Sequence, residues 1–204
     1  MASMSREFIG GRLCLDFANT VDWRRRVGPE ELLPDYLGLV DWSVRAGTLP
    51  AADARRLAAA ARKHPRAAAG AFAKALVLRE AFHRTALARA HGETPPELDL
   101  AQIGYSYAEA VEKARLSVDG ASYEWTFDES ARDLDRPWWP VAVSAVELLT
   151  SPELARVREC EGRGCGWLFL DESRSRTRRW CSAAGCGNRE RVRRHYERTR
   201  RPVR

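Results

Sequence analysis

The 204-residue chain has no long apolar run. No stretch approaches the roughly 18 to 20 apolar residues that a membrane span needs. Its opening, MASMSREFIGGRLCLDF, contains arginines but no apolar core of the kind found in a signal peptide. These absences argue against a membrane or secreted protein and predict a cytoplasmic chain with reduced thiols. In a reducing compartment, paired cysteines hold metal more often than they form disulfides.

The sequence also lacks the signatures of common enzymes. It has no glycine-rich phosphate loop, no nucleophile elbow and no paired catalytic carboxylates. No ligand or catalytic pattern joins the cysteines to the four histidines, which are His64, His83, His91 and His195. Asp16, Asn19 and Thr20 follow an apolar segment and could line a small pocket, but these residue types favour turns and helix caps. We therefore expect a protein that is not an enzyme.

Lysine is scarce, since only three of the 34 basic residues are lysine. Codon usage in a GC-rich genome would explain this arginine bias, but it does not explain where the arginines lie. Residues 151–204 hold 15 basic against 7 acidic residues, whereas residues 1–150 hold 19 against 21. From residue 174 onward, 12 arginines face 2 glutamates. Such a basic block attracts polyanions, and nucleic acid first among them.

The hydrophobic pattern predicts a helix-rich α+β fold. FIGGRLCLDF, residues 8–17, has the alternation of a short strand, in which Cys14 is a buried structural thiol. Helices are predicted over 34–47, 51–64, 65–91, 103–114, 140–150 and 152–159, and a hairpin with an Asp119-Gly120 turn over 116–127. Trp138 and Trp139 are predicted core anchors. No linker separates the two predicted domains, which are residues 1–150 and residues 151–204.

Four cysteines form two matched knuckles. CEGRGCG at 160–166 and CSAAGCG at 181–187 each place four residues between their cysteines and end in Gly-Cys-Gly. Gly166 and Gly187 suit tight turns that need a positive φ. Zinc takes four thiolates in a tetrahedron, and such a site has no open position for a reacting water. We predict one structural zinc per chain, with a redox disulfide switch as the alternative, on Cys160, Cys165, Cys181 and Cys186.

The surroundings of the knuckles contain two predicted elements. Residues 167–180 read as a hairpin from Trp167 to Trp180 with a polar turn, and Asn188 is a candidate N-cap for a helix that ends near Thr199. Val192 and Tyr196 share one face of this helix and are expected to pack on the zinc core. A second stripe of the helix is basic and consists of Arg191, Arg194 and Arg198, with Arg193 beside it.

Two interpretations of the basic helix stay open. It is a solvated surface if the i,i+4 pairs Glu190 with Arg194 and Arg193 with Glu197 form. However, these glutamates cannot neutralise the arginines around them, and phosphates would relieve the repulsion between Arg194 and Arg198. Arg179 and Arg189 are candidates to balance the negative charge of a zinc ion with four thiolates. We favour nucleic acid, with candidate contacts at Arg176, Arg178, Arg191, Arg193, Arg194 and Arg198.

Two motifs resemble a known family. The Cys-x4-Cys knuckle, Trp167-x-Phe169-x-Asp171, RRWCS and the tetrad Cys-Gly-Asn-Arg at 186–189 resemble the CGNR zinc finger. GGRLCLDFANT resembles the opening of the ABATE domain, a family of stress-induced transcription regulators in bacteria. The resemblance implies a treble-clef-like or knuckle-like zinc module on the four cysteines, and DNA binding. We expect Gly166, Gly187, Asn188 and Arg189 to support the knuckle structurally.

The sequence therefore predicts a cytoplasmic, nucleoid-associated transcription regulator that binds DNA through a zinc finger and a basic C-terminal helix. One alternative is a zinc module that docks an acidic protein surface. Another is RNA binding by stacking on Trp167 or Trp180. Counterion release separates nucleic acid from a protein partner, because it gives a steep salt dependence. A small-molecule effector of the N-terminal domain and a homodimer remain open.

Overall fold

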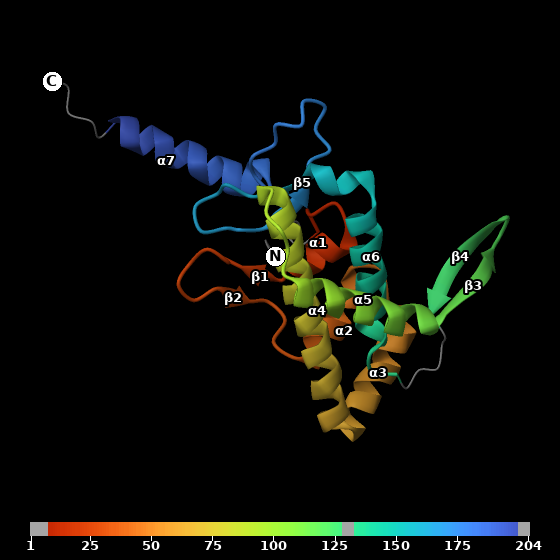
Figure 1. Ribbon diagram of the computed structural model, residues 1–204. Coiled ribbons are helices and arrows are strands. Elements are labelled where there is room, and N and C mark those ends of the chain that lie inside the picture. The colour runs from red at the N-terminus through yellow and green to blue at the C-terminus, as the bar shows by residue number, and fades with distance from the viewer. Residues whose placement is uncertain (1–7, 128–132, 200–204) are drawn as a thin grey trace.

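The computed structural model describes residues 8–127 and 133–199 (Figure 1). Helices dominate this part of the chain, and its strands form three separate two-stranded antiparallel sheets. None of the described helices is long and apolar enough to cross a membrane. The elements in chain order are α1 Leu13–Ala18, β1 Val21–Asp22, β2 Glu30–Glu31, α2 Tyr36–Arg45, α3 Ala51–Lys63, α4 Pro65–His91, α5 Glu97–Glu112, β3 Ala114–Asp119, β4 Ser122–Phe127, the 3-10 turn η2 Arg136–Trp138, α6 Trp139–Thr150, the 3-10 turn η3 Pro152–Arg156, β5 Val157–Glu159, β6 Leu168–Leu170, the π turn η4 Ala183–Gly187 and α7 Asn188–Thr199.

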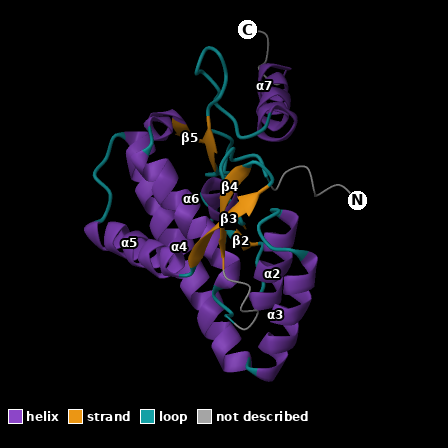
Figure 2. Ribbon diagram, turned by 90° about the vertical axis from the view of Figure 1, so that its right-hand side faces the viewer, coloured by secondary structure: helices purple, strands orange, loops and turns teal. Residues whose placement is uncertain are grey.

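The long helix α4 organises the body of the molecule. It begins at Pro65, whose fixed φ suits a first helical position. It ends at His91, because the next residue, Gly92, takes the left-handed conformation with φ +75°. Helices α1, α5 and α6 pack on it around the fully buried Trp138 and Trp139. Helices α2 and α3 pair beside its N-terminal half (Figure 2). The two tryptophan anchors and the helices predicted over 34–47, 51–64, 65–91, 103–114 and 140–150 are confirmed, although α5 begins at Glu97, before the predicted start.

The strand predicted over residues 8–17 is wrong, because Leu13–Ala18 is the helix α1. Alternation of apolar residues marks a strand with one buried face, but α1 lies between α4, α6 and β6 and is buried nearly all round. The Asp16 carboxylate accepts a 2.7 Å hydrogen bond from the Gly10 N–H and closes the turn before the helix. Cys14 is fully buried as predicted, and burial raises the pKa of its thiol to about 12.

The hairpin β3–β4 is confirmed, and it projects from the body of the molecule (Figure 1). Gly120 lies in its turn with φ +58°. The register places Leu116 opposite Trp125 and Val118 opposite Tyr123. Directly opposed residues share one face of an antiparallel pair, so these four side chains form a single apolar face. All four are exposed.

Two further predictions around the first knuckle are corrected. The helix predicted over 152–159 is only the 3-10 turn η3, capped by Ser151, and it is followed by β5. The strand β6 pairs with β5, with Val157 opposite Leu170, and not with the segment around Trp180. The segment after β6 cannot continue as a strand because the Asp171 carboxylate accepts hydrogen bonds from the backbone N–H groups of Ser173 and Arg178. The first knuckle is therefore the turn of the β5–β6 hairpin.

The hairpin β5–β6 belongs to the same core as the helices. Leu168 and Leu170 are buried in one cluster with Trp138 and the other body residues. The Asn19 amide clamps β6, since its Oδ1 accepts from the Leu168 N–H at 2.9 Å and its Nδ2 donates to the Leu168 carbonyl at 2.8 Å. The Leu170 N–H donates to the Gly10 carbonyl. This shared core explains why the sequence contains no linker at this point.

We predict that Asn19→Ala lowers the free energy of unfolding by about 2–3 kcal/mol, because it leaves the buried N–H and carbonyl of Leu168 without partners. Urea unfolding followed by circular dichroism measures the loss. Ser175→Ala is the control, since its hydroxyl contacts only exposed Thr177 among the described residues. An Asn19→Ala variant as stable as this control would show that the clamp is dispensable.

Candidate metal centre and nucleic-acid interface

Four buried thiols form one compact cluster. The Sγ atoms of Cys160, Cys165, Cys181 and Cys186 all lie within 4.8 Å of one another. The Cys165–Cys181 distance is 3.9 Å and the Cys181–Cys186 distance is 3.6 Å. Zinc–thiolate bonds of about 2.3 Å in a tetrahedron place the sulfurs about 3.8 Å apart. None of the four is in a disulfide. The donor set therefore fits one structural zinc ion, as predicted.

The backbone around the cluster shapes the two knuckles. Gly166 takes the predicted positive φ, +72°, whereas Gly187 is helical, so the second knuckle does not use the same turn. The N–H groups of Gly162 and Cys181 donate to Cys160 Sγ at 3.4 and 3.3 Å. A Cβ on Gly162 would lie 2.9 Å from Cys186 Sγ. Glycine is therefore required at position 162 for the knuckles to close on one another.

The thiols strongly affect one another. Hydrogen bonds from the neighbouring thiols lower the pKa of Cys160 and of Cys186, and the same contacts raise the pKa of Cys165 and of Cys181. Four thiolates at this spacing need a cation between them, which is the chemistry of a metal-binding donor set. Arg189 Nη2 also donates to Cys186 Sγ at 2.9 Å, in line with its predicted support of the knuckle.

Arg179 does not reach the thiols. It pairs with Glu161 instead, and its guanidinium lies 5.4 Å from the centroid of the Trp180 ring. The charge of the cluster is thus balanced locally by Arg189 and not by both predicted arginines.

The basic helix α7 is fixed at its first turn only. Ser182, and not Asn188, caps the preceding turn η4 by accepting from the Gly185 N–H, so the helical segment begins earlier than predicted. Glu190 is 7% exposed and accepts from the backbone N–H of Arg163. The expectation that Val192 and Tyr196 pack on the zinc core is wrong, since they are 45% and 60% exposed. The reason is that α7 leaves the body after its first turn (Figure 1).

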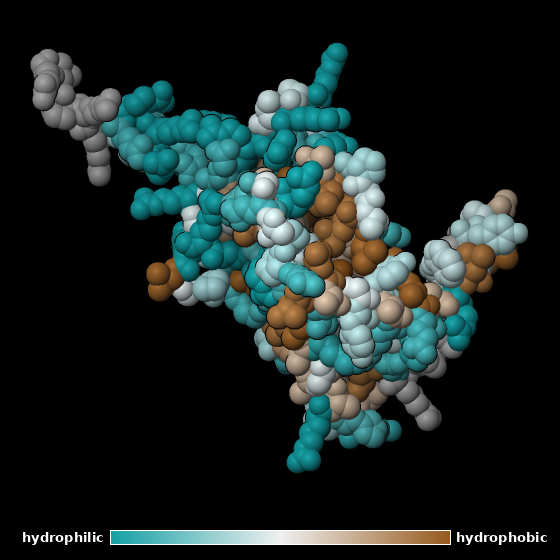
Figure 3. All heavy atoms as spheres, in the orientation of Figure 1, coloured by the Kyte–Doolittle hydropathy of each residue, from teal (hydrophilic) through white to brown (hydrophobic). Residues whose placement is uncertain are grey.

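The arginines of α7 fall into two groups. Arg193 is paired with Glu190 and Glu197, and Glu190 thus contacts Arg193 in place of the predicted Arg194. The second group has no hydrogen bond or ion pair within residues 8–127 and 133–199, and it lines a cleft of about 240 Å³ with Trp180 and Gly187. This group, the free stripe, consists of Arg191, Arg194 and Arg198. Figure 3 shows a hydrophilic surface over α7.

The two candidate contacts in the loop between β6 and α7 differ. Arg176 is exposed and has no side-chain partner in the described part of the chain. Arg178 donates to the carbonyls of Trp180 and Cys181, and its guanidinium lies 4.4 Å from the Phe169 ring centroid. The side chain of Arg178 therefore holds the loop on the metal centre. The arginines at 200, 201 and 204 lie outside the described residues.

A second basic surface was missed by the sequence analysis. It lies between β1 and β2, where Arg24, Arg25 and Arg26 follow Trp23. The N–H groups of Arg24 and Arg25 donate to the carbonyls of Cys165 and Gly164, so this loop is bound to the first knuckle. Together with Arg163, Arg189 and Arg193, the loop lines a cleft of about 510 Å³. Three consecutive arginines in an otherwise acidic half of the chain were the signal that could have revealed it.

Trp23 is the centre of this second surface. It has φ +55°, an uncommon conformation for a bulky residue that marks local strain. Its ring carries two guanidinium groups, that of Arg26 at 3.4 Å and that of Arg189 at 4.7 Å from the centroid. Because Arg189 also binds Cys186, the ring joins the N-terminal loop to the metal centre.

We predict one zinc per chain, and loss of that zinc in Cys181→Ser. The variant should retain the helical body but unfold at a lower temperature, because the small C-terminal module depends on metal for its folding free energy. Elemental analysis with thermal unfolding measures both effects. Cys14→Ala is the control and should keep its zinc. Protein purified without chelator that contains no zinc, or has the mass of two intramolecular disulfides, would contradict the assignment.

Comparison with known families agrees with this geometry. Residues 11–152 match the ABATE family, described as "Putative stress-induced transcription regulator", and residues 156–199 match the CGNR zinc finger. Neither description is that of an enzyme. No curated protein matches the chain. Since the first match covers more than half of the sequence, the chain belongs to the ABATE family and carries a CGNR zinc finger behind its ABATE domain.

Proposed function

We propose that this regulator binds double-stranded DNA through α7 and the loop between β1 and β2, both held by the zinc centre. The observation that carries the proposal is the free stripe, Arg191, Arg194 and Arg198. These three exposed cations have no carboxylate partner among residues 8–127 and 133–199, and they repel one another on one helix face. Phosphate groups would remove that repulsion and release counterions, which is the main source of affinity for nucleic acid.

The shape of α7 suits a groove of duplex DNA. The helix has 12 residues, so it is about 18 Å long, and its stripe from Arg191 to Arg198 extends about 10 Å along the axis. The major groove is about 12 Å wide and admits one α-helix. Because only the first turn of α7 packs on the zinc module, the rest of the helix is accessible to a partner. A regulator of this kind would act at the nucleoid.

The second surface includes part of the first knuckle and meets α7 on a different face from the free stripe. Arg26 and Arg163 are exposed, and neither side chain pairs with a carboxylate in the described residues. We infer that they contact the phosphate backbone beside the groove that α7 occupies. Phosphate contacts fix the register of a protein on DNA without reading sequence. Arg178 and Arg193 support the site mainly through their contacts within the protein.

The alternatives are weakened by particular contacts. RNA binding by stacking on Trp167 is disfavoured, because Trp167 is 5% exposed and its Nε1 donates to the Val21 carbonyl. Trp180 remains available beside the free stripe. Docking on an acidic protein surface uses the same arginines, and the salt dependence of binding distinguishes it from DNA.

We predict that the unsubstituted protein, the parent, binds duplex DNA and that log K falls with log salt with a slope near −4 to −5. This value assumes about five phosphate contacts, each contributing roughly −0.9 to the slope. Replacing the free stripe, in Arg191→Ala/Arg194→Ala/Arg198→Ala, should make the slope less steep by about 2.7. Fluorescence anisotropy at several salt concentrations measures both values.

The matched control for this experiment is Arg55→Ala/Arg62→Ala/Arg66→Ala. These arginines are exposed on α3 and at the start of α4, and their loss removes the same net charge. Figure 1 shows α3 and α7 in different parts of the molecule. The control should bind DNA almost as the parent does. If the stripe variant matches the control, α7 is not the DNA-binding surface. If the parent itself does not bind at low salt, a protein partner takes the place of DNA.

A separate prediction concerns the second surface. Arg26→Ala/Arg163→Ala should reduce the salt slope by about 1.8, because two phosphate contacts are lost, and should weaken all duplex sequences alike. Its zinc content should be unchanged. Arg55→Ala/Arg62→Ala removes the same charge and is the control in the same titration. An unchanged slope would limit the interface to α7.

A further inference from the structure

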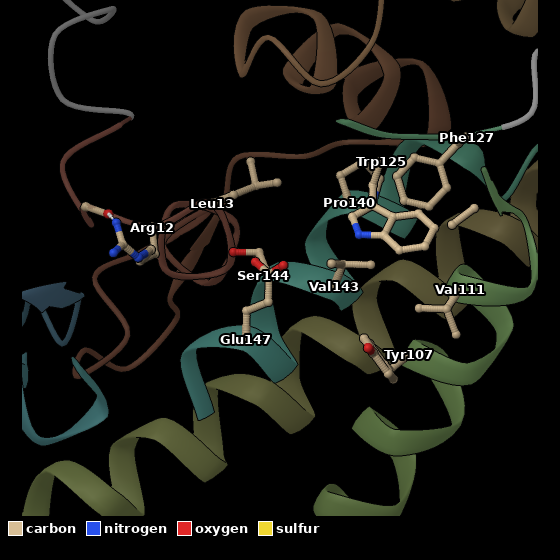
Figure 4. Close-up of a pocket in the computed structure, with 12 residues that line it drawn as sticks. Arg12, Leu13, Tyr107, Val111, Trp125, Phe127, Pro140, Val143, Ser144 and Glu147 are labelled. Carbon is tan, nitrogen blue, oxygen red and sulfur yellow. Dashed lines mark hydrogen bonds between the residues drawn. The ribbon is translucent and has the colours of Figure 1, made fainter. Parts of the chain in front are cut away.

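A large pocket lies in the ABATE domain. It has a volume of about 750 Å³ and opens between α5, α6, the hairpin β3–β4 and the segment Gly11–Leu13 (Figure 4). Sites for small organic ligands have volumes of about 300–1,000 Å³. The pocket is therefore of the right size for one such molecule.

The walls of the pocket are mainly apolar and aromatic. Figure 4 shows Trp125 and Phe127 of the hairpin near Pro140 of α6, while Tyr107 and Val111 project from α5. Trp125 is 68% exposed at the edge of the pocket. A large aromatic side chain this exposed, continuous with an apolar pocket, is a contact surface for a ligand with an apolar body.

The charge at the other end of the pocket is negative. Glu147 lies there on α6, and its carboxylate has no hydrogen-bond or ion-pair partner among residues 8–127 and 133–199 (Figure 4). Arg12 also lines this end, but its guanidinium is paired with Glu153 and donates to the Gly11 carbonyl. A ligand therefore meets one exposed carboxylate without an ion-pair partner among the described residues, beside the Arg12–Glu153 ion pair.

We propose that this pocket binds a hydrophobic organic cation. The apolar body of the ligand lies against Trp125, Phe127 and Val143, and its positive charge faces Glu147. The electron-rich faces of Tyr107 and Trp125 attract the same cation, and such contacts strengthen as water is excluded. An anionic ligand of equal shape is repelled by Glu147. Arg12 does not offset this repulsion, because its guanidinium is already paired with Glu153.

The segment Gly11–Leu13, which forms one wall of the pocket, also contacts the zinc module. Leu13 lines the pocket, and three residues earlier the Gly10 carbonyl accepts from the Leu170 N–H of β6. Arg12 is paired with Glu153 of η3, directly before β5. The inference that the ligand changes DNA binding through these contacts rests on the proposed function. Binding of the cation itself does not, and it is measured without nucleic acid.

The test uses two probes of the same shape and opposite charge, tetraphenylphosphonium and tetraphenylborate, titrated into the full zinc-loaded chain by calorimetry. The cation should bind at least tenfold more tightly than the anion. Glu147→Gln should weaken binding of the cation about tenfold and leave the anion unweakened. Trp125→Ala should weaken both probes. The control is Glu97→Gln, which removes the same charge at the first residue of α5, outside the pocket lining. This variant should bind both probes as the parent does.

Equal affinity of the parent for the two probes would overturn the proposal. A Glu147→Gln variant that binds tetraphenylphosphonium as tightly as Glu97→Gln would overturn it too. If neither probe binds at millimolar concentration, the pocket is not a site for such ligands. In that case sedimentation should be used to measure whether the protein is a dimer. If it is a dimer and Tyr123→Ala/Trp125→Ala is a monomer, the apolar face of the β3–β4 hairpin binds a second copy of the chain.

Discussion

The C-terminal part of the molecule depends on the neutralisation of four thiols within 4.8 Å of one another. The apolar core around them is small, and its buried residues other than cysteine are Trp167 and Phe169. Without a cation the thiolates repel one another, so metal binding and folding of this part are one process. The β5–β6 hairpin and the first turn of α7 meet at this cluster, and the bond from the Arg163 N–H to Glu190 also holds that turn.

The metal centre is not a separate appendage. Asn19 binds both backbone groups of Leu168, and the Trp167 indole donates to the Val21 carbonyl. The β5–β6 hairpin is consequently both the support of the zinc and a layer of the helical body. The end of α1 is thus linked to the residues that follow the first knuckle by direct hydrogen bonds. This continuity is what a regulator needs if a pocket in its helical body is to influence a surface on its finger.

The arginines near the metal centre form two groups, those with hydrogen-bond or ion-pair partners in the protein and those without such partners among the described residues. Arg178, Arg189 and Arg193 are held by carbonyl, thiol or carboxylate groups of the protein. They shape the module, and a partner would compete with those bonds. The stripe on α7 carries charge without such bonds, and that charge is available for a polyanion. Counting basic residues along the chain could not make this division, because it depends on which side chains meet after folding.

The sequence by itself determined the elements whose signals are local. The helices over α2 to α6 follow from apolar periodicity and from breakers such as Pro65 and Gly92, and the β3–β4 hairpin follows from its alternation and turn. The zinc ligands also follow from spacing, since four cysteines in two matched knuckles are typical of a structural zinc site. Arg189 was identified because it belongs to a motif with a recognisable family pattern.

Only the tertiary structure decided the rest. Leu13–Ala18 is a helix because neighbours surround it on nearly every side, and burial of that kind removes the difference between a strand and a helix pattern. Pairing of β6 with β5 depends on contacts across the first knuckle, and α7 exposes Val192 and Tyr196 because it leaves the body. The cleft around Trp23 joins residues more than 130 positions apart. The sequence contains each of these side chains, but their proximity is a property of the folded core.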